Sequence, residues 1–533
     1  MTRLESVWTD MGSLSDLEEK GRLLRKRDGK QIALFLHDGV VKACDNRCPH
    51  EGYPLIEGTV AEGSAHCVLT CNWHNWKFDL DSGETLTGGD KLRRYPARIT
   101  SAGRIELDLV DPPADTVIVE ALDNLADCFD RVEYDRMARE VARLIKAGGD
   151  PLDALRRAIT ELWEKFEYGA THALPASADW LSLRKEDGTD PVRNLSMLVE
   201  CIGHFAWDTR REPVYAFAAG RADWDEDGFV AAVEREDEAA ACAMVRGAFA
   251  AGLSWADVER AFARAALAHY ADFGHSAIYT YKMRALSDHL GDRDSVERLC
   301  LLLTRSIITA SREDLIPEFR AYAPALTAWD GMGTEVPDAD TLKKGSLRAI
   351  LEKISAGGAD PDAVFDACME AGAWQMLHFD LSWQDRTDST VSQSVGWLDF
   401  THTLTFGNAV RKLCEAHPDL WPQGLLQIGC FLSRNGGFTD PALDSAKWET
   451  DAPLSAVEAA LKGVEDHGRF EYIVACHQLK LSFALREEMT ERPDRSWHRI
   501  AAAALTRFLN SPLKRKHVRR VAHQALAFVG AAE

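Results

Sequence analysis

Basic residues and long apolar runs are both scarce in this sequence. Its 62 Lys and Arg residues are outnumbered by 84 Asp and Glu residues, which leaves a formal net charge of −22. Because nucleic acids and anionic membranes repel such a charge, we expect neither as a partner, whereas a basic protein would be attracted. The first twenty residues are acidic and polar, and no window is long and apolar enough to span a bilayer. The sequence therefore predicts a soluble, cytoplasmic protein.

A nucleotide-binding signature is also missing, because no G-x-G-x-x-G string of the kind that binds flavin or nicotinamide occurs. Twelve cysteines are an ordinary number for 533 residues, and apart from the two in the motifs described below they stand singly in segments with helical spacing, such as VECIG and DACME. We expect these to be reduced, buried thiols. A chain of this length exceeds the reach of one hydrophobic core, and so at least two domains are expected.

Two short motifs near the N-terminus each contain one cysteine and one histidine. Cys48 and His50 lie in CPH, and Cys71 and His74 lie in CNWH. Two thiolates on one iron and two imidazoles on the other hold a Rieske [2Fe–2S] cluster. The following segments, GYPLIEGTV and NWKFDLDSGE, resemble the cluster-binding loops of Rieske proteins. The resemblance implies such a cluster on these four residues; a Cys2His2 zinc site and a chance arrangement of core residues are the alternatives.

The motifs depart from the usual Rieske pattern in two respects. Twenty residues separate His50 from Cys71, slightly more than is usual, and Asn72 stands where Pro or Ser is commoner. The additional loop cysteines of high-potential Rieske proteins are missing, and Tyr53 and Asn75 stand near the motifs instead of their Ser and Tyr donors. Fewer hydrogen bonds to the sulfurs lower the reduction potential. We therefore expect a low-potential, ferredoxin-like centre that supplies an oxygenase.

The two parts of the chain differ in hydrophobic pattern. Short β runs separated by Gly and Asp turns occupy Gln31 to Leu109, and DPPAD at 111–115 ends them. Beyond this point the sequence is rich in Ala and Leu with helical spacing. We predict an α+β multidomain protein with a small antiparallel β Rieske domain at 1–112 and a large all-α domain at 113–533.

Helix punctuation recurs along the second part with a period of about 104 residues. A Gly stop followed by an Asp or Ser start lies at 147–155, 251–259 and 356–364. Pro213, Pro317 and Pro422 are separated by the same spacing. A shortened fourth unit would begin at 451–461. The pattern predicts duplicated helical units.

Histidines recur with these units, at His172, His275, His378 and His477. A single histidine is more often structural than ligating, but a redox cluster needs an acceptor, and a metal on grouped histidines would supply one. The Asp-Phe-x-His-Ser/Thr string around His275 recurs at His402, and so His402 ranks above His378 as a ligand, with His378 outside the first shell of ligands. The segment 382–397 is then an inserted loop that could cover the site.

Lys480 lies three residues after His477 and hence on the same helix face. As a cation it would repel a metal, and so it must point away, be neutralised, or be carbamylated to an anionic ligand. A solvent-facing lysine on an amphipathic helix is the alternative.

His172-Ala-Leu-Pro and His477-Gln-Leu-Lys480-Leu resemble motifs of the questin oxidase-like family, whose members are associated with oxidative opening of anthraquinone-type rings. The resemblance spans about residues 130–530 and implies one non-haem iron held by four histidines and a modified lysine. Carried over to this chain, these are His172, His275, His402, His477 and Lys480. A fused Rieske domain is not usual in that family.

Ordinary Rieske oxygenases offer a second comparison, because they carry a carboxylate three residues before a His pair. The nearest string here contains His269 and His275, with Ala266 in the place of the carboxylate. Two rings six residues apart on a helix face different ways. The C-terminal part is therefore not expected to be of that type.

Together these patterns give a functional hypothesis. The Rieske centre accepts electrons from a separate NAD(P)H-dependent reductase or ferredoxin and passes them to a His-rich iron site, which activates O2 to oxygenate a small aromatic or polycyclic substrate. Phe273, Tyr279 and Phe406 could line its pocket. One alternative is an electron carrier or redox sensor whose helical part is a partner-binding scaffold without a second metal. The other is a cofactor-free Baeyer–Villiger-like oxidase. The basic cluster at 512–520 is expected to be a solvated helix face or helix cap.

Overall fold

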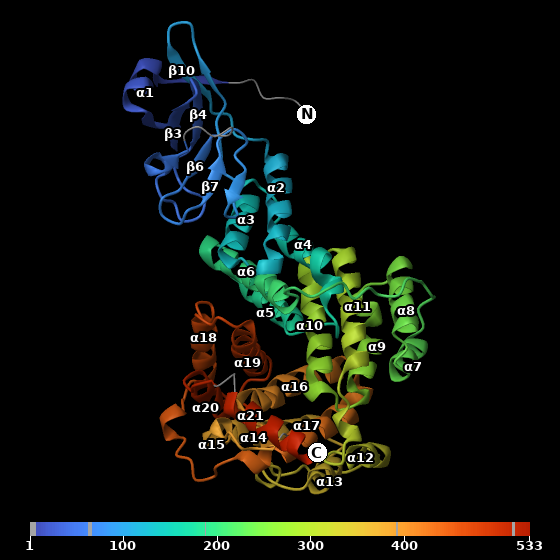
Figure 1. The fold of residues 1–533 in the computed structure, drawn as a ribbon. Helices are drawn as coiled ribbons and strands as arrows, with labels where there is room; N and C mark the ends of the chain where they lie inside the picture. The colour runs from blue at the N-terminus through green and yellow to red at the C-terminus, as the bar shows by residue number, and fades with distance from the viewer. Residues whose placement is uncertain (1–6, 62–66, 187, 391–392, 514–517, 533) are drawn as a thin grey trace. The chain divides into compact units, whose positions relative to one another are not determined.

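The computed structural model describes residues 7–61, 67–186, 188–390, 393–513 and 518–532 (Figure 1). The chain divides into two compact units. The first comprises Met1–Cys128 and Glu133–Asp150, and the second comprises Phe129–Val132 and Pro151–Glu533. The small β part followed by a large helical part, predicted from the sequence, is confirmed. The predicted domain boundary after residue 112 stays a prediction, and two helices beyond it belong to the first unit.

Ten strands form three antiparallel sheets in the described part of the first unit. The first sheet has the order β1 (Trp8–Ser13), β10 (Arg104–Asp108), β9 (Ala97–Ile99). The second has the order β2 (Arg22–Arg27), β3 (Lys30–His37), β4 (Val40–Asp45). The third has the order β5 (Thr59–Val60), β6 (Val68–Thr70), β7 (Lys77–Asp79), β8 (Thr85–Thr87). The unit also contains α1 (Leu14–Lys20), α2 (Ala114–Asp127) and α3 (Tyr134–Lys146).

The central strand β3 separates two hydrophobic cores because successive side chains of a strand point to opposite faces. Ile32 and Leu34 enter one core. Phe35 enters the other, which also contains the two motif cysteines, Cys48 and Cys71. The cysteine side chains are thus anchored in the core of the unit rather than on its surface.

The second unit is built from helices. Its first half contains α4 (Asp153–Leu162), α5 (Ala173–Glu186), α6 (Pro191–Asp208), α7 (Glu226–Glu234), α8 (Glu238–Ala250), α9 (Trp255–Ala268), α10 (His275–Leu290) and α11 (Arg293–Thr309). Its second half contains α12 (Tyr322–Ala328), α13 (Leu347–Ala356), α14 (Pro361–Leu377), α15 (Leu381–Asp385), α16 (Trp397–Ala416), α17 (Trp421–Asn435), α18 (Pro453–Val464), α19 (Tyr472–Glu491), α20 (Trp497–Leu509) and α21 (Val518–Ala532). No helix in the described ranges has the length and apolar composition that crossing a membrane requires.

Four helices of the second unit close into a ring. Helix α5 packs against α10, α10 against α16, α16 against α19, and α19 against α5. Each ring helix follows a helix that begins near a predicted start, namely α4, α9, α14 and α18. Between α14 and α16 a further short α-helix, α15, intervenes, and it overlaps the start of the segment predicted as an inserted loop. The order of elements follows the predicted period; that duplication produced it stays a prediction.

Candidate metal centres

Two tight loops of the first unit carry the Cys-x-His and Cys-x-x-His motifs. In the first loop the Cys48 amide donates to the Tyr53 carbonyl at 2.9 Å, and the Gly52 amide donates back to the Cys48 carbonyl at 2.8 Å. In the second loop the Cys71 amide donates to the Trp76 carbonyl at 2.7 Å. Each loop therefore closes on its own cysteine, which fixes the ligand positions by backbone hydrogen bonds.

The four motif side chains converge. Nδ1 of His50 lies 3.1 Å from Nδ1 of His74, and the two rings meet edge to face. The Cys48 and Cys71 thiols are buried beneath them and contact each other. Two imidazole nitrogens on one side and two thiols on the other are the donors that a [2Fe–2S] cluster with mixed ligands requires. The residues present therefore fit this cluster.

Aromatic rings cover both candidate histidines. Trp76 stacks on His50 with ring centroids 4.6 Å apart, and Trp73 stacks on His74 at 5.3 Å. Gly88, with φ +127°, lets the chain pass the Trp76 ring, because a Cβ there would lie 2.4 Å from it. Trp73 is 59% exposed. The histidine edge of the site is thus framed by tryptophans, one of them at the surface.

Helix α3 is attached to the first loop through a buried carboxylate. Asp90 has a fully buried side chain and accepts from Arg139 at 2.6 and 3.1 Å and from Arg143 at 3.1 Å. Arg139 also donates to the backbone carbonyl of His50 at 3.4 Å. Sequence reasoning missed this contact, because Asp90 and Arg139 are 49 residues apart and neither belongs to a recognisable motif. A guanidinium charge therefore lies beside a candidate ligand loop.

The ring of helices in the second unit brings four predicted histidines together. His172 directly precedes α5, His275 is the first residue of α10, and His402 and His477 lie in the second turns of α16 and α19. Gly274, with φ +80°, permits the sharp entry into α10, and a Cβ there would lie 2.4 Å from the Phe406 ring. The N-terminal ends of four helices thus present four imidazoles to one point.

The imidazole nitrogens of these residues face one another. Nε2 of His275 lies 3.1 Å from Nε2 of His172, and Nε2 of His477 lies 3.3 Å from Nε2 of His402. The His275 and His402 ring centroids are 4.5 Å apart, and those of His172 and His477 are 4.8 Å apart. One ring nitrogen from each of His172, His275 and His402 fits within 4.8 Å. This spacing is compact enough for these three to share one ion, and His477 joins the group through its contact with His402.

Backbone carbonyls fix the tautomers. Nδ1 of His275 donates to the Asp272 carbonyl at 2.5 Å, and Nδ1 of His477 donates to the Ile473 carbonyl at 2.6 Å. The His402 ring bonds in the same way to the backbone of Leu398. Because a carbonyl only accepts, each Nδ1 must carry the proton and each Nε2 a lone pair.

Burial also keeps the rings uncharged, since it lowers the pKa of His172, His402 and His477 well below the usual value. His402 and His477 then direct two lone pairs at each other across 3.3 Å, and neither can donate. A cation placed between them satisfies both, and neutral imidazole is the form that binds metals. The donor set therefore fits a metal ion.

Lys480 lies beside this cluster and is only 1% exposed. The alternative of a solvent-facing Lys480 is therefore wrong. Its Nζ has no hydrogen-bond partner among the described residues, and burial lowers the pKa of the amine. A second buried lysine, Lys282, donates to Asp179 at 2.7 Å instead. An unpartnered buried amine is costly, so Lys480 needs an explanation that Lys282 does not.

Other histidines lie apart from the cluster. His378 caps α14, stacks on Trp374 and bonds to the Asp440 carbonyl at 3.0 Å. His269 contacts Asp314 at 2.9 Å and Glu234 at 3.1 Å. His378 thus lies outside the group of four converging imidazoles, and the ranking of His402 above His378 as a ligand stays a prediction.

The three candidate pocket aromatics have different places. The Tyr279 hydroxyl lies 3.3 Å from Nδ1 of His172 and is buried, so it orients that ring. Phe406 is buried against Gly274. Phe273 meets the Tyr270 ring edge to face. Of the three, Tyr279 contacts the histidine cluster directly.

Residues 7–96 match the Rieske [2Fe-2S] domain family, and the first unit therefore contains a Rieske domain, which implies a [2Fe–2S] cluster. This match favours the iron–sulfur interpretation of the two loops over a zinc site. Beyond residue 96 the family match gives no information, and the resemblance to the questin oxidase-like family stays a prediction.

Three curated relatives are similar to the chain. A human (Homo sapiens) "Rieske domain-containing protein" is 30% identical over 76 residues, which is 14% of this chain and 48% of the relative. A "4beta-methylsterol monooxygenase" of Methylococcus capsulatus (strain ATCC 33009 / NCIMB 11132 / Bath) is 35% identical over 82 residues, or 13% of this chain and 21% of the relative. The "Naphthalene 1,2-dioxygenase system, ferredoxin component" of Pseudomonas putida is 29% identical over 104 residues, or 19% of this chain and 95% of the relative. The chain thus spans less than half the length of the first two, and Rieske domains of this kind occur in oxygenase systems.

Proposed function

We propose that the protein is a Rieske-dependent oxygenase, in which the Rieske cluster passes electrons to a non-haem iron held by the histidine cluster, and an aromatic or polycyclic substrate is oxygenated there. The observation that carries the proposal is the set of four imidazoles whose ring nitrogens converge, two of them half-buried (His172 and His275) and two buried (His402 and His477). The similarity of the first unit to components of oxygenase systems supports it.

In the first unit, Cys48 and Cys71 would hold one iron of the cluster and His50 and His74 the other. When bound, the cluster accepts and releases one electron at a time. The chain contributes burial of the two thiols and stacking of Trp76 and Trp73 on the imidazoles. A separate NAD(P)H-dependent reductase or a ferredoxin would supply the electrons.

In the second unit, His172, His275, His402 and His477 would hold the iron. When bound with one open position, such an iron supplies the chemistry by which O2 is activated. The Asp272 and Ile473 carbonyls hold the proton of two rings on Nδ1, and the Tyr279 hydroxyl orients a third. Burial of His402, His477 and Tyr279 limits the access of water to the site.

Lys480 would complete the site after carbamylation. Its neutral amine attacks CO2, a C–N bond forms, and one proton is released, which leaves an anionic carbamate. Its Nζ has no hydrogen-bond partner among the described residues, and burial lowers the pKa of the amine, which favours the neutral form that reacts with CO2. The carbamate oxygens would give the iron an anionic ligand in place of the neutral amine.

The reaction balances with a reductase as the electron source. In a mono-oxygenation, one oxygen atom of O2 enters the substrate and the other leaves as water, which consumes two electrons and two protons. In a dioxygenation both atoms enter the substrate. The product therefore distinguishes the two types, and 18O2 labelling followed by mass spectrometry would identify which one occurs.

Elemental analysis tests the second iron. We expect about three irons per chain in the purified protein, two in the cluster and one on the histidines. The double variant Cys48→Ala/Cys71→Ala should keep one iron. The double variant His275→Ala/His402→Ala should lose one iron and keep the visible cluster spectrum. His378→Ala is the matched control, because His378 also bonds to a carbonyl but lies outside the cluster. Two irons in the wild type would support an electron carrier instead.

A further inference from the structure

We infer that a cavity at the N-terminal ends of α16 and α19 binds the aromatic substrate as a neutral molecule; this inference rests on the proposed function. The cavity has a volume of about 410 Å³. Its apolar wall residues are Val395, Trp397, Leu398, Ile473, Val474 and Leu513. The volume lies within the range of small-molecule sites.

The cavity is close to the histidine cluster by the geometry of the two helices. Leu398 lies four residues before His402, and Ile473 lies four residues before His477, and so each is one turn, about 6 Å, away along its helix. The backbones of the same two residues hold the imidazole rings. The residues that orient two ring nitrogens therefore also form the cavity wall.

Four polar side chains of the wall, Gln384, Ser394, Asp399 and Arg520, are engaged by the protein, and Glu471 adds a carboxylate to the wall. Arg520 donates to the carbonyls of Trp383, Gln384 and Arg386 at 3.0 to 3.2 Å and to the Ser394 hydroxyl at 2.6 Å. Asp399 accepts from its own helix start, the Gly396 amide, at 2.9 Å. With its guanidinium satisfied, this wall offers little to an anion. An uncharged aromatic molecule is the class that matches it.

Arg520 has a positioning role here. It is 5% exposed, and its four acceptors all belong to the segment between α14 and α16 that was predicted to cover the site. The expectation that the whole basic cluster at 512–520 is solvated is therefore wrong for Arg520, while residues 514–517 lie outside the described residues. Arg520 fixes one wall of the cavity.

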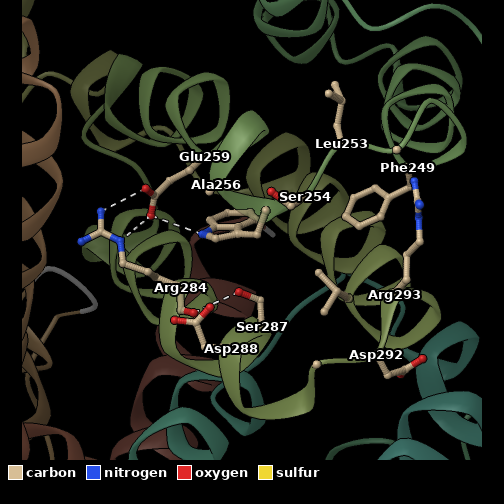
Figure 2. Close-up of a pocket in the computed structure, with 14 residues that line it drawn as sticks. Phe249, Leu253, Ser254, Ala256, Glu259, Arg284, Ser287, Asp288, Asp292 and Arg293 are labelled. Atoms are coloured by element: carbon tan, nitrogen blue, oxygen red, sulfur yellow. Dashed lines mark hydrogen bonds and ion pairs between the residues drawn. The ribbon is translucent and has the colours of Figure 1, made fainter.

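A second cavity of the same unit has the opposite character. It has a volume of about 450 Å³ and lies between the ends of α8, α9, α10 and α11 (Figure 2). Figure 2 shows Glu259 and Arg284 paired in its wall, at 2.9 and 3.0 Å, with Asp288 and Ser287 beside them. Arg284 lies nine residues after His275, about 13 Å along α10. This cavity is charged and remote from the histidines.

Binding of 2-naphthol to the iron-loaded, full-length protein tests the inference by isothermal titration calorimetry. Leu398→Trp places an indole in the cavity at a half-buried position and should weaken binding at least tenfold. Val474→Phe should also weaken binding at least tenfold, and it replaces Leu398→Trp in the test if that variant does not fold. Ser287→Phe fills the second cavity and should leave the affinity unchanged. Absence of 2-naphthol binding, or equal affinity in both cavity-filling variants and wild type, would overturn the inference.

A second readout separates this inference from the proposed function. Bound 2-naphthol should change the electron paramagnetic resonance spectrum of the nitric oxide adduct of the second iron, and Leu398→Trp should remove this change. If the protein holds a second iron but does not bind 2-naphthol, the assignment of the cavity as the substrate site is refuted and the proposed function is not. Binding that Leu398→Trp abolishes in a protein with only two irons supports the cavity and refutes the proposed function.

Discussion

The two buried lysines of the helical unit have opposite chemical environments. Lys282 has the Asp179 carboxylate at 2.7 Å, whereas Lys480 has no hydrogen-bond partner among the described residues. We expect Lys480 alone to be carbamylated. With 13C-labelled bicarbonate, the wild type should show a carbamate carbon signal by nuclear magnetic resonance. Lys480→Met should lose that signal and bind the second iron on the order of tenfold more weakly.

Lys282→Arg is the matched control for that experiment. It removes a buried lysine amine but keeps the charge opposite Asp179, and so it should retain both the carbamate signal and the iron. If Lys480→Met kept the signal, or if the wild type never gave one, the amine would have to be neutral and unmodified.

The carboxyl of Glu140 on α3 should make stability depend on pH. Burial raises the pKa of Glu140 from 4.5 to about 7, against the opposing effect of Arg143. Between these values the folded protein binds a proton that the unfolded chain does not. The free energy of unfolding of the first unit should therefore fall as pH rises from 4.5 to 7, by about 3 kcal/mol. Denaturant titrations at several pH values, followed by cluster absorbance, measure this.

Because other groups also titrate in this range, the difference between variant and wild type isolates Glu140. Glu140→Gln should remove most of the fall. Glu120→Gln on the exposed face of α2 should leave it intact. A pH profile of Glu140→Gln that is parallel to the wild type would show that the buried carboxyl ionises normally.

At the scale of elements, α3 couples to a candidate ligand loop through Asp90. Arg139 bonds both to this buried carboxylate and to the His50 carbonyl, while Arg143 bonds to Asp90 without the second contact. A nearby positive charge stabilises the reduced cluster, because reduction adds an electron. Arg139→Met should therefore lower the midpoint potential, by an energy on the order of 1 kcal/mol. Potentiometric titration of the full-length protein measures it.

Arg143→Met is the matched control, since it weakens the same carboxylate pair one turn further along α3. We expect a smaller shift in potential for Arg143→Met and a similar loss of stability, because both variants leave Asp90 with one guanidinium. Equal potentials in the two variants would assign the effect to Asp90 rather than to the contact with His50.

The sequence allowed prediction of those elements and ligands that have a local signature. Cys48, His50, Cys71 and His74 stand in short motifs, and Gly and Asp turns separate the strands around them. The motifs and the strands were therefore recognisable from the sequence. Contacts such as Asp90 with Arg139 were not, because buried ion pairs between distant segments leave no periodicity in the sequence. In the helical unit, the repeated string around His275 and His402 compensated for this lack of long-range information.

At the scale of the whole molecule, the order of the helices explains why four histidines meet. Ring closure by α5, α10, α16 and α19 depends on side-chain packing over the full length of the unit, which helix periodicity alone does not specify. The sequence predicted which histidines are equivalent, and the packing shows that their helices are neighbours. Burial of Lys480 follows from the same closure, and no local pattern could have distinguished it from a surface lysine.

The proposed function predicts that the cluster reduces the histidine-bound iron of the same chain, without an encounter between molecules. After anaerobic reduction of the cluster, mixing with O2 and substrate should reoxidise it at a rate that stays constant when the protein is diluted tenfold, because a step within one chain is first order. Stopped-flow absorbance of the cluster measures the rate. In His275→Ala/His402→Ala, which lacks two residues of the proposed acceptor site, reoxidation should slow to the background reaction with O2, whereas His378→Ala should match the wild type. A rate proportional to protein concentration would mean that the cluster of one chain reduces the iron of another, and an unchanged rate in the double variant would mean that the histidine cluster is not the acceptor.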